Sequence, residues 1–332
     1  GAKRCRFLHI YKGDDALNIV VMDYKTVTSG DVSLKVFEDF GKVTYLPLTS
    51  PKNVAEAIKD ADVVLCNKTP MTAENMSGAK NLKFIGLFAT GYNNIDLDYT
   101  NTHGITVCNA GSYSTSAVVQ HTFALLLEMT NRVAEYNAFT HKNGWCESET
   151  FSPFIYDIME LSGKTMGIVG YGSIGKAVAN VACTFGMNVI VNTRTVREDG
   201  ITKFVSFEEL LENSDIISLH CPLNKQSEKL FNAETFAKMK QGAYFINTAR
   251  GGIVDEVALA DSLKSGHLGK AAVDTIAVEP MRNDCPLKDA PNLLITPHVA
   301  WAPKETRERL VGIVYNNLKN FIDGKPTNVV TA

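Results

Sequence analysis

With 332 residues, the chain is long enough for two domains that each bury a hydrophobic core. Charged residues are 21% and the formal net charge is -3, so no basic surplus favours nucleic acid or an anionic membrane surface, and no apolar run approaches the roughly 18 residues of a membrane span. The seven cysteines are scattered, odd in number and without a Cys-x-x-Cys pair, which argues against a disulfide framework and against a zinc site. We therefore expect a cytoplasmic protein with no metal, nucleic-acid partner or membrane attachment.

From Asn18 onwards, short β-rich runs alternate with helix-like segments. Helices are expected near residues 32–40 and 54–59, and strands at Ile19–Met22, Val43–Leu46, Val63–Cys66, Phe84–Leu87 and Ile105–Cys108. This alternation is typical of a parallel sheet with helices on its faces. Residues 1–17, with a strand-like run at Phe7–Tyr11, precede the pattern and stay unexplained.

A long helix is predicted next. Ser114 and Thr115 are suitable N-terminal capping residues, and the helical pattern continues towards Asn143 and Gly144. Its middle is apolar on nearly every side, which requires burial between domains or against another subunit. We interpret this helix as the junction between two domains.

The stretch Thr165–Gly175 reads Thr-Met-Gly-Ile-Val-Gly-Tyr-Gly-Ser-Ile-Gly and combines a strand-type run with the pattern G-x-G-x-x-G. A helix is predicted for residues 174–185 and a strand for residues 188–191, which completes a dinucleotide-binding βαβ unit. In such a unit Gly170 allows the tight turn, Gly172 lets the backbone approach a pyrophosphate, and Gly175 lets the helix pack on its strand. The first-turn N–H groups, at Ser173 and Ile174, would face the phosphates. The alternative is a glycine-rich turn without a ligand.

The rest of the chain continues the α/β alternation. Strands are expected at Ile216–Leu219, Ala243–Asn247, Ala271–Asp274 and Leu293–Thr296, and an amphipathic helix at Glu305–Asp323. We expect a six-stranded doubly wound sheet, which binds dinucleotides at the carboxyl ends of its strands.

Three polar residues follow predicted strands of the second domain: Arg250, Glu279 and His298. Chemistry on a small keto acid needs a cation for the carboxylate, a proton donor for the carbonyl oxygen and a group that keeps the donor charged. Arginine, histidine and glutamate can fill these roles. Each also has an ordinary alternative: an ion pair for Arg250, a solvated loop position for Glu279 and a buried structural ring for His298. The other histidines, His121 among them, show no partner pattern and are expected to be structural.

These features resemble the D-isomer-specific 2-hydroxyacid dehydrogenase family over almost the whole chain from Asn18, and within it the branch of glycerate dehydrogenases and hydroxypyruvate reductases. The order and spacing of the matching stretches make the resemblance specific. They are Asn67–Pro70, Ala89–Asn93, Gly170–Gly175, His220–Leu223, Asn247–Asp255 and Thr296–Trp301.

The resemblance implies an α/β fold of two doubly wound parallel-sheet domains. A flavodoxin-like substrate-binding domain would comprise residues 1–110 and 302–332, and a Rossmann dinucleotide-binding domain residues 111–301. It also implies a homodimer with the long helix at the interface, in which a tryptophan at the position of Trp145 reaches the neighbour's cleft.

The resemblance further implies roles for individual residues. Arg250, Glu279 and His298 would be catalytic, and the Thr90-Gly91-Tyr92 backbone would help Arg250 to hold the substrate carboxylate. Asp274 and the Ala249 backbone would hold the nicotinamide amide, with Cys221 and Pro222 on the adenosine side.

The chain departs from the commonest pattern at the end of the second strand of the βαβ unit. NAD-preferring members carry an acidic residue about 20 positions beyond the fingerprint, where it bonds the ribose 2′-hydroxyl. That place is occupied by Thr193, followed by Arg194, with Arg197 close behind. A hydroxyl beside a guanidinium suits a 2′-phosphate, so we expect NADP(H) to be preferred and NAD(H) to be possible. The alternative is that Arg194 stacks on adenine or points to solvent while NAD binds.

The expected reaction is the reduction of a short 2-keto acid, with hydroxypyruvate and glyoxylate preferred over pyruvate or branched keto acids. Three alternatives stay open. One is an interaction protein that senses NAD(H), which the intact Arg, Glu and His disfavour. Another is a D-3-phosphoglycerate dehydrogenase, whose long forms append a regulatory domain after the region matched here. The third, a formate dehydrogenase, resembles a different pattern around the catalytic histidine.

Overall fold

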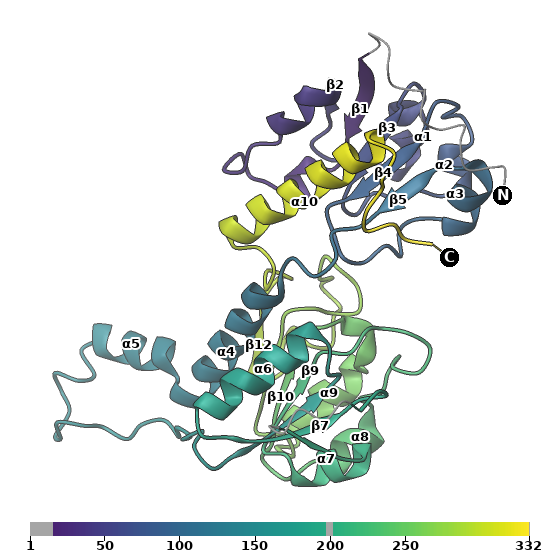
Figure 1. Ribbon diagram of the computed structural model, residues 1–332. Coiled ribbons are helices and arrows are strands. Elements are labelled where there is room, and N and C mark those ends of the chain that lie inside the picture. The colour runs from purple at the N-terminus through teal and green to yellow at the C-terminus, as the bar shows by residue number, and fades with distance from the viewer. Residues whose placement is uncertain (1–15, 197–201, 332) are drawn as a thin grey trace. The chain divides into compact units, whose positions relative to one another are not determined.

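The computed structural model describes residues 16–196 and 202–331, so the predictions on Phe7–Tyr11 and on Arg197 lie outside the described residues. The chain forms two compact units (Figure 1). One consists of the chain up to Tyr113 together with the part from Ala302 onwards, and the other is Ser114–Trp301. The boundaries between the units thus fall after Tyr113 and before Ala302. The sequence placed them after residue 110 and before residue 302.

The first unit is built on a five-stranded sheet in the order β2-β1-β3-β4-β5, in which every paired neighbour is parallel. This is the strand order of flavodoxin-like folds. All residues of β3 and β4 are buried, as in strands covered on both faces. The strands are β1 (Leu17–Val21), β2 (Gly41–Tyr45), β3 (Val63–Cys66), β4 (Phe84–Leu87) and β5 (Thr106–Cys108).

The helices of this unit include one from the far end of the sequence. Helix α10 (Lys304–Ile322) packs on β4, where Phe321 meets Phe84 with ring centroids 4.9 Å apart. Of the apolar stripe that the amphipathic pattern predicts, Leu310, Val314 and Leu318 are buried, and Ile313 and Phe321 are half-buried. The other helices are α1 (Val54–Ile58), α2 (Ala73–Met76) and α3 (Leu97–His103), and the helix expected near residues 32–40 is a 3-10 helix, η2 (Lys35–Phe40). Shorter 3-10 turns are η1 (Tyr24–Thr26) and η3 (Pro51–Asn53).

The second unit is built on a seven-stranded parallel sheet in the order β12-β11-β10-β9-β6-β7-β8. The strands are β6 (Thr165–Val169), β7 (Asn188–Asn192), β8 (Lys203–Phe204), β9 (Ile216–Leu219), β10 (Tyr244–Asn247), β11 (Lys270–Val273) and β12 (Leu293–Ile295). Six strands were expected. The additional one, β8, has two residues, too few to show a period of two in the sequence.

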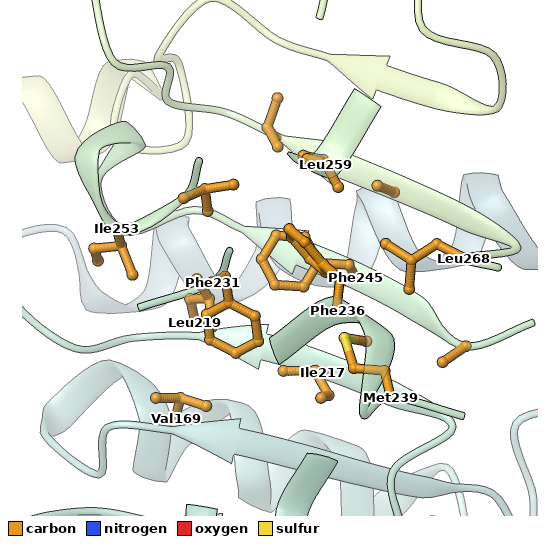
Figure 2. Close-up of a cluster of buried hydrophobic side chains, with 14 of the residues drawn as sticks. Val169, Ile217, Leu219, Phe231, Phe236, Met239, Phe245, Ile253, Leu259 and Leu268 are labelled. Atoms are coloured by element: carbon orange, nitrogen blue, oxygen red, sulfur yellow. The ribbon is translucent and has the colours of Figure 1, made fainter. Parts of the chain in front are cut away.

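Both faces of this sheet are covered by helices. Figure 2 shows the aromatic core of one face, where Phe231, Phe236 and Phe245 lie within 6 Å of one another by ring centroids, at distances of 5.8, 5.0 and 5.3 Å. On the other face α4 packs against α6, through buried residues such as Phe123 and Val178. The helices are α4 (Thr115–Asn131), α5 (Val133–His141), α6 (Ser173–Thr184), α7 (Phe207–Asn213), α8 (Ala233–Ala237) and α9 (Glu256–Lys264), with the 3-10 turn η4 (Gly251–Ile253).

The prediction of one long helix up to Asn143 was wrong, because the structure has two helices that meet at Arg132. This residue adopts a left-handed conformation with φ 53° and ψ 43°. Its N–H still bonds the Glu128 carbonyl at 2.9 Å, which closes α4, and its guanidinium pairs with Glu135 and lies 4.5 Å above the Tyr156 ring. No glycine or proline marks the break, so the pattern gave no signal. Ser114 precedes α4 but makes no side-chain capping bond.

Within the described ranges, no helix is long and apolar enough to cross a membrane. The six described cysteines are free thiols.

Candidate functional site

The glycine turn lies where the strand order of the second sheet reverses, because the chain leaves β6 for β7 on one side while β9 pairs on the other. Dinucleotides bind at such switch points in open α/β sheets. Gly170 has φ 95°, and a Cβ there would lie 2.6 Å from the Cys221 backbone nitrogen, so the turn packs on the chain that leaves β9. A Cβ on Gly175 would lie 2.1 Å from the Gly170 carbonyl oxygen. Only glycine fits at these two positions.

Gly172 differs from the other two glycines. It is the N-cap residue of α6, where no side chain caps the first N–H groups, and a Cβ there would meet nothing within 4 Å. The turn is therefore open on the side where the helix presents unpaired N–H donors. This arrangement fits the close approach of a pyrophosphate.

A cavity of about 440 Å³ opens beside this turn. It lies between the ends of β6, β7 and β9 and includes six of the predicted cofactor-binding residues: Gly170, Gly172, Thr193, Arg194, Cys221 and Pro222. Ser173, Ile174 and Gly175 do not line it but form the start of α6. The remaining lining residues are Val169, Tyr171, Asn192, Thr195, His220, Asn224, Gln226, Ser227 and Leu230, which sequence reasoning did not single out for this role.

The cavity's charge is set by one residue. Among its described lining residues, none is Asp or Glu, and Arg194 is the cation. His220 adds no charge, because burial lowers the pKa of its imidazole to about 3, and its Nε2 lies 2.9 Å from the Ser218 hydroxyl. The exposed Arg194 side chain therefore faces no carboxylate within the cavity wall.

The second cluster of polar residues lies at the carboxyl ends of β10, β11 and β12. These three strands are adjacent and parallel, so the residues that follow them come to one edge of the sheet. Arg250 follows β10, Glu279 follows β11 and His298 follows β12. The His298 Nδ1 lies 2.8 Å from Glu279 Oε2, and both side chains are partly exposed.

Two short loops hold Arg250 and Glu279 in place. The Asn247 side chain, which is buried, accepts from the Ala249 N–H and donates to the Arg250 carbonyl, each at 3.0 Å. Glu256 of α9 accepts from the Ala277 N–H at 2.7 Å. These bonds fix the backbone on either side of the strand ends.

His298 sits in a left-handed backbone conformation, with φ 55°. Its N–H bonds the Asp274 carbonyl at 2.8 Å, and the Asp274 carboxylate accepts the N–H groups of Val299 and Ala300, each at 2.9 Å. Burial by itself would raise the pKa of Asp274, but hydrogen bonds from His121, Thr296 and these N–H groups outweigh it and hold the pKa below its usual value. Asp274, expected to hold an amide, thus already binds the turn that carries His298.

His121 was expected to be an ordinary structural histidine without a partner pattern. The structure places its Nε2 2.9 Å from the Thr296 hydroxyl and 3.4 Å from the Asp274 carboxylate. Thr296 lies two residues before His298 in the same turn. Sequence could not reveal this contact, since 175 positions separate His121 from Thr296.

The three residues predicted to bind the substrate carboxylate through their backbone belong to the first unit. Thr90, Gly91 and Tyr92 follow β4, and the Thr90 carbonyl accepts from the Asn109 amide at 2.8 Å. The Thr90 hydroxyl donates to the Gly111 carbonyl. These bonds hold the segment firmly at the carboxyl end of the first sheet.

Chemically, the second unit therefore combines a cavity beside the glycine turn with a hydrogen-bonded His–Glu pair and an arginine along one sheet edge. The pair can hold a proton on an imidazole that a carboxylate orients, and the guanidinium can grip an anion. No group of three or more His, Cys, Asp or Glu side chains suited to a metal ion occurs in the described part of the chain.

Comparison with known proteins agrees with this architecture. Residues 123–300 match the family described as D-isomer specific 2-hydroxyacid dehydrogenase, NAD binding domain. A hydroxypyruvate reductase of Blautia hydrogenotrophica is 40% identical over 320 residues, which cover 95% of this chain and 99% of that protein.

Two solved structures are similar over nearly the whole chain. An acyclic imino acid reductase in complex with NADPH and D-Arg has a TM-score of 0.83 at 28% identity and covers 95% of this chain and 100% of its own. A D-lactate dehydrogenase from Aquifex aeolicus, complexed with NAD and lactic acid, has a TM-score of 0.81 at 29% identity and covers 93% and 96%. The chain belongs to the D-isomer specific 2-hydroxyacid dehydrogenase family, whose members are NAD(P)-dependent oxidoreductases.

Proposed function

We propose that this enzyme is a D-2-hydroxyacid dehydrogenase that reduces short 2-keto acids such as hydroxypyruvate or glyoxylate to the corresponding 2-hydroxy acids, with NADPH as its preferred cofactor and NADH as a possible one. The observation that carries the proposal is the 2.8 Å contact between His298 and Glu279, beside Arg250 and on the same sheet as the glycine turn. The hydroxypyruvate reductase relative supports the substrate class.

The cavity and glycine turn fit a dinucleotide. The open side of Gly172 and the first turn of α6, with Ser173 and Ile174, would hold its pyrophosphate, and Cys221 and Pro222 would line the adenosine side. Asp274 and the Ala249 backbone would hold the nicotinamide amide. When bound, the nicotinamide supplies the hydride.

The three residues at the strand ends, Arg250, His298 and Glu279, would bind the substrate and protonate it. Arg250 grips the substrate carboxylate together with the backbone of Thr90-Gly91-Tyr92 and polarises the carbonyl. His298 holds a proton for the carbonyl oxygen and gives it up as the alcohol forms. Glu279 orients the ring through Nδ1, which leaves Nε2 to face the substrate.

The test of this proposal is a panel of keto acids assayed at 340 nm, with NADPH and with NADH, on the wild type and on His298→Ala. Hydroxypyruvate and glyoxylate should have the highest kcat/KM. For hydroxypyruvate the physical reason is its 3-hydroxyl, because a pocket built to bond this group rejects an analogue without it, such as pyruvate. His298→Ala should lose roughly 10²- to 10⁴-fold in kcat with little change in KM. Near-normal turnover by this variant, or a clear preference for branched or aromatic keto acids, would refute the assignment.

The cofactor preference rests on the wall of the cavity. Thr193 and Arg194 follow β7 and line it, and its described lining contains no carboxylate to repel a 2′-phosphate. The guanidinium offers a bidentate partner and the hydroxyl a donor.

We also propose that the enzyme is a cytoplasmic homodimer. The second unit exposes large apolar side chains along residues 145–158, and a groove of about 400 Å³ between α4 and α6 is lined by Val119, Phe123 and Val181 among others. Exposed apolar surface of this kind marks an interaction site. In a dimer, the exposed apolar segment 145–158 of one copy would pack against the groove between α4 and α6 of the other.

A further inference from the structure

A residue of α4 is joined by hydrogen bonds to the turn that presents His298. The His121 Nε2 lies 2.9 Å from the Thr296 hydroxyl, which lies 2.6 Å from Asp274 Oδ1. Asp274, with 1% of its surface exposed, accepts the N–H groups of Val299 and Ala300 on either oxygen. The chain of bonds therefore runs from α4 to both sides of His298.

The donors and acceptors available in these side chains determine the direction of each hydrogen bond in the series. The lowered pKa of Asp274 keeps it ionised at neutral pH, so its oxygens only accept, and the single hydroxyl proton of Thr296 is donated to it. The Thr296 oxygen can then only accept from His121, which must carry a proton on Nε2. One arrangement of donors and acceptors satisfies all three groups.

The backbone of His298 needs such support. A non-glycine residue at φ 55° is in a sparsely populated region, and its surroundings must hold it there. The bonds from Val299 and Ala300 to Asp274, together with that from the His298 N–H to the Asp274 carbonyl at 2.8 Å, form the turn. If the carboxylate rotates, the Nδ1 contact of His298 with Glu279 loses its geometry.

We propose that His121 is a positioning residue for the reaction: its Nε2–H holds Thr296 and Asp274 in the one arrangement that presents His298 to Glu279 and to the substrate. The inference rests on the proposed role of His298. His121 itself touches neither substrate nor cofactor in this scheme. It acts on the proton donor through the turn.

The test compares His121→Leu, which removes the donor, with His121→Gln, whose amide can still donate to Thr296. With the keto acid that the wild type reduces best, we expect His121→Leu to lower kcat about tenfold, in the range of couplings within one hydrogen-bond network. The KM values for the keto acid and for the dinucleotide should stay within roughly twofold, as for a loss confined to the transition state. His121→Gln should keep most of the activity, and His141→Leu, the same change at an exposed position of α5, should have no effect.

Thr296→Val provides a second test, because it breaks the same series of hydrogen bonds while leaving His121 in place, and it should also lower kcat. Circular dichroism would check that each variant folds. If both residues act through one chain of bonds, His121→Leu combined with Thr296→Val should be no slower than Thr296→Val alone. Losses that multiply, a wild-type kcat in His121→Leu, or a loss confined to the KM of the dinucleotide would each overturn the inference. His298→Ala separates the two claims, because normal turnover there defeats the proposed function, whereas a normal His121→Leu defeats only this inference.

Discussion

Arg194 is the single side chain with the largest expected effect on cofactor choice. The combined change Thr193→Asp/Arg194→Ala replaces a phosphate partner with a carboxylate suited to a ribose hydroxyl. We expect a loss of roughly 10- to 100-fold in kcat/KM for NADPH, which corresponds to one charged hydrogen bond, with a smaller loss or a gain for NADH. Steady-state kinetics with both cofactors would measure it.

Lys264→Ala on α9 is a suitable control for this change, because it removes an exposed positive charge that does not line the cavity. A wild type that uses NADH as well as or better than NADPH would contradict the preference.

His220 should make the second unit less stable in acid. The pKa of its imidazole falls from 6.5 to about 3 on folding. Between these pH values His220 binds a proton in the unfolded chain but not in the folded one. The stability from the neutral ring is thus complete above pH 6.5 and declines as pH falls towards 3. At pH 5 the free energy of unfolding should be about 2 kcal/mol lower than above pH 6.5 because of this group.

Guanidinium denaturation of wild type and His220→Gln at pH 7.5 and pH 5 would isolate this contribution, because glutamine can still bond Ser218 but does not titrate. The difference between the two proteins should shrink or reverse on acidification. Parallel pH profiles would show that His220 is not held neutral by the fold.

Residue types and their places after strands were enough to predict Arg250, Glu279 and His298 as one group. The same reasoning missed His121, because its partners depend on how α4 packs on the far end of the sheet, which no local pattern encodes. The family resemblance implies that Asp274 holds the nicotinamide amide, which stays a prediction, and it gave no sign of the turn that Asp274 binds.

Within the βαβ element, two glycines should respond differently to the same added methyl group. Gly175→Ala would place a Cβ 2.1 Å from the Gly170 carbonyl oxygen and should cost roughly 1–3 kcal/mol through overpacking, seen as a lower Tm. Gly172→Ala meets open space and has an extended backbone, so the free protein should keep its Tm. It should nevertheless raise the KM of the dinucleotide strongly, because the methyl group occupies the approach of the pyrophosphate.

Thermal unfolding followed by circular dichroism, combined with cofactor kinetics, separates the two effects. Equal Tm losses in both variants, or unchanged cofactor KM in Gly172→Ala, would mean that the turn does not bind phosphate as proposed.

Elements were predicted well where burial gave a clear pattern. Strands β3, β4 and β9 begin and end where expected, because their apolar runs are covered on both faces. The helix pair α4 and α5 was predicted as one helix, since no glycine or proline marks the break at Arg132, whose side chain pairs with Glu135 three residues on and lies over the more distant Tyr156 ring. The 3-10 helix η2 and strand β8 were missed or mistyped because short elements carry too few residues to show a period.

For the whole molecule, the proposed homodimer leads to a direct prediction. Phe151 and Phe154 are 91% and 89% exposed in a segment that Figure 1 draws beyond α5, to one side of the sheet of its own unit. Phe151→Ser/Phe154→Ser should shift the enzyme from dimer towards monomer, as measured by size-exclusion chromatography with light scattering. Val257→Ser, which changes an exposed valine of α9, is the matched control. A monomeric wild type would contradict the proposal.

The two parallel sheets and the return of the last helix to the first unit were within reach of the sequence, because alternation of strands and helices and a family resemblance both point to them. Individual hydrogen bonds across the sheet were not, since they depend on register between segments far apart in the chain.

The strand order also bears on engineering. Thr193, which we propose to influence the choice of cofactor, follows β7, and Arg250, which we propose to grip the substrate, follows β10, with β6 and β9 between them. Three strand spacings of about 4.8 Å put these sites roughly 14 Å apart, beyond the distance at which substitutions normally interfere. Cofactor preference and keto-acid preference can therefore be changed in separate mutant libraries, and the selected substitutions can be combined afterwards.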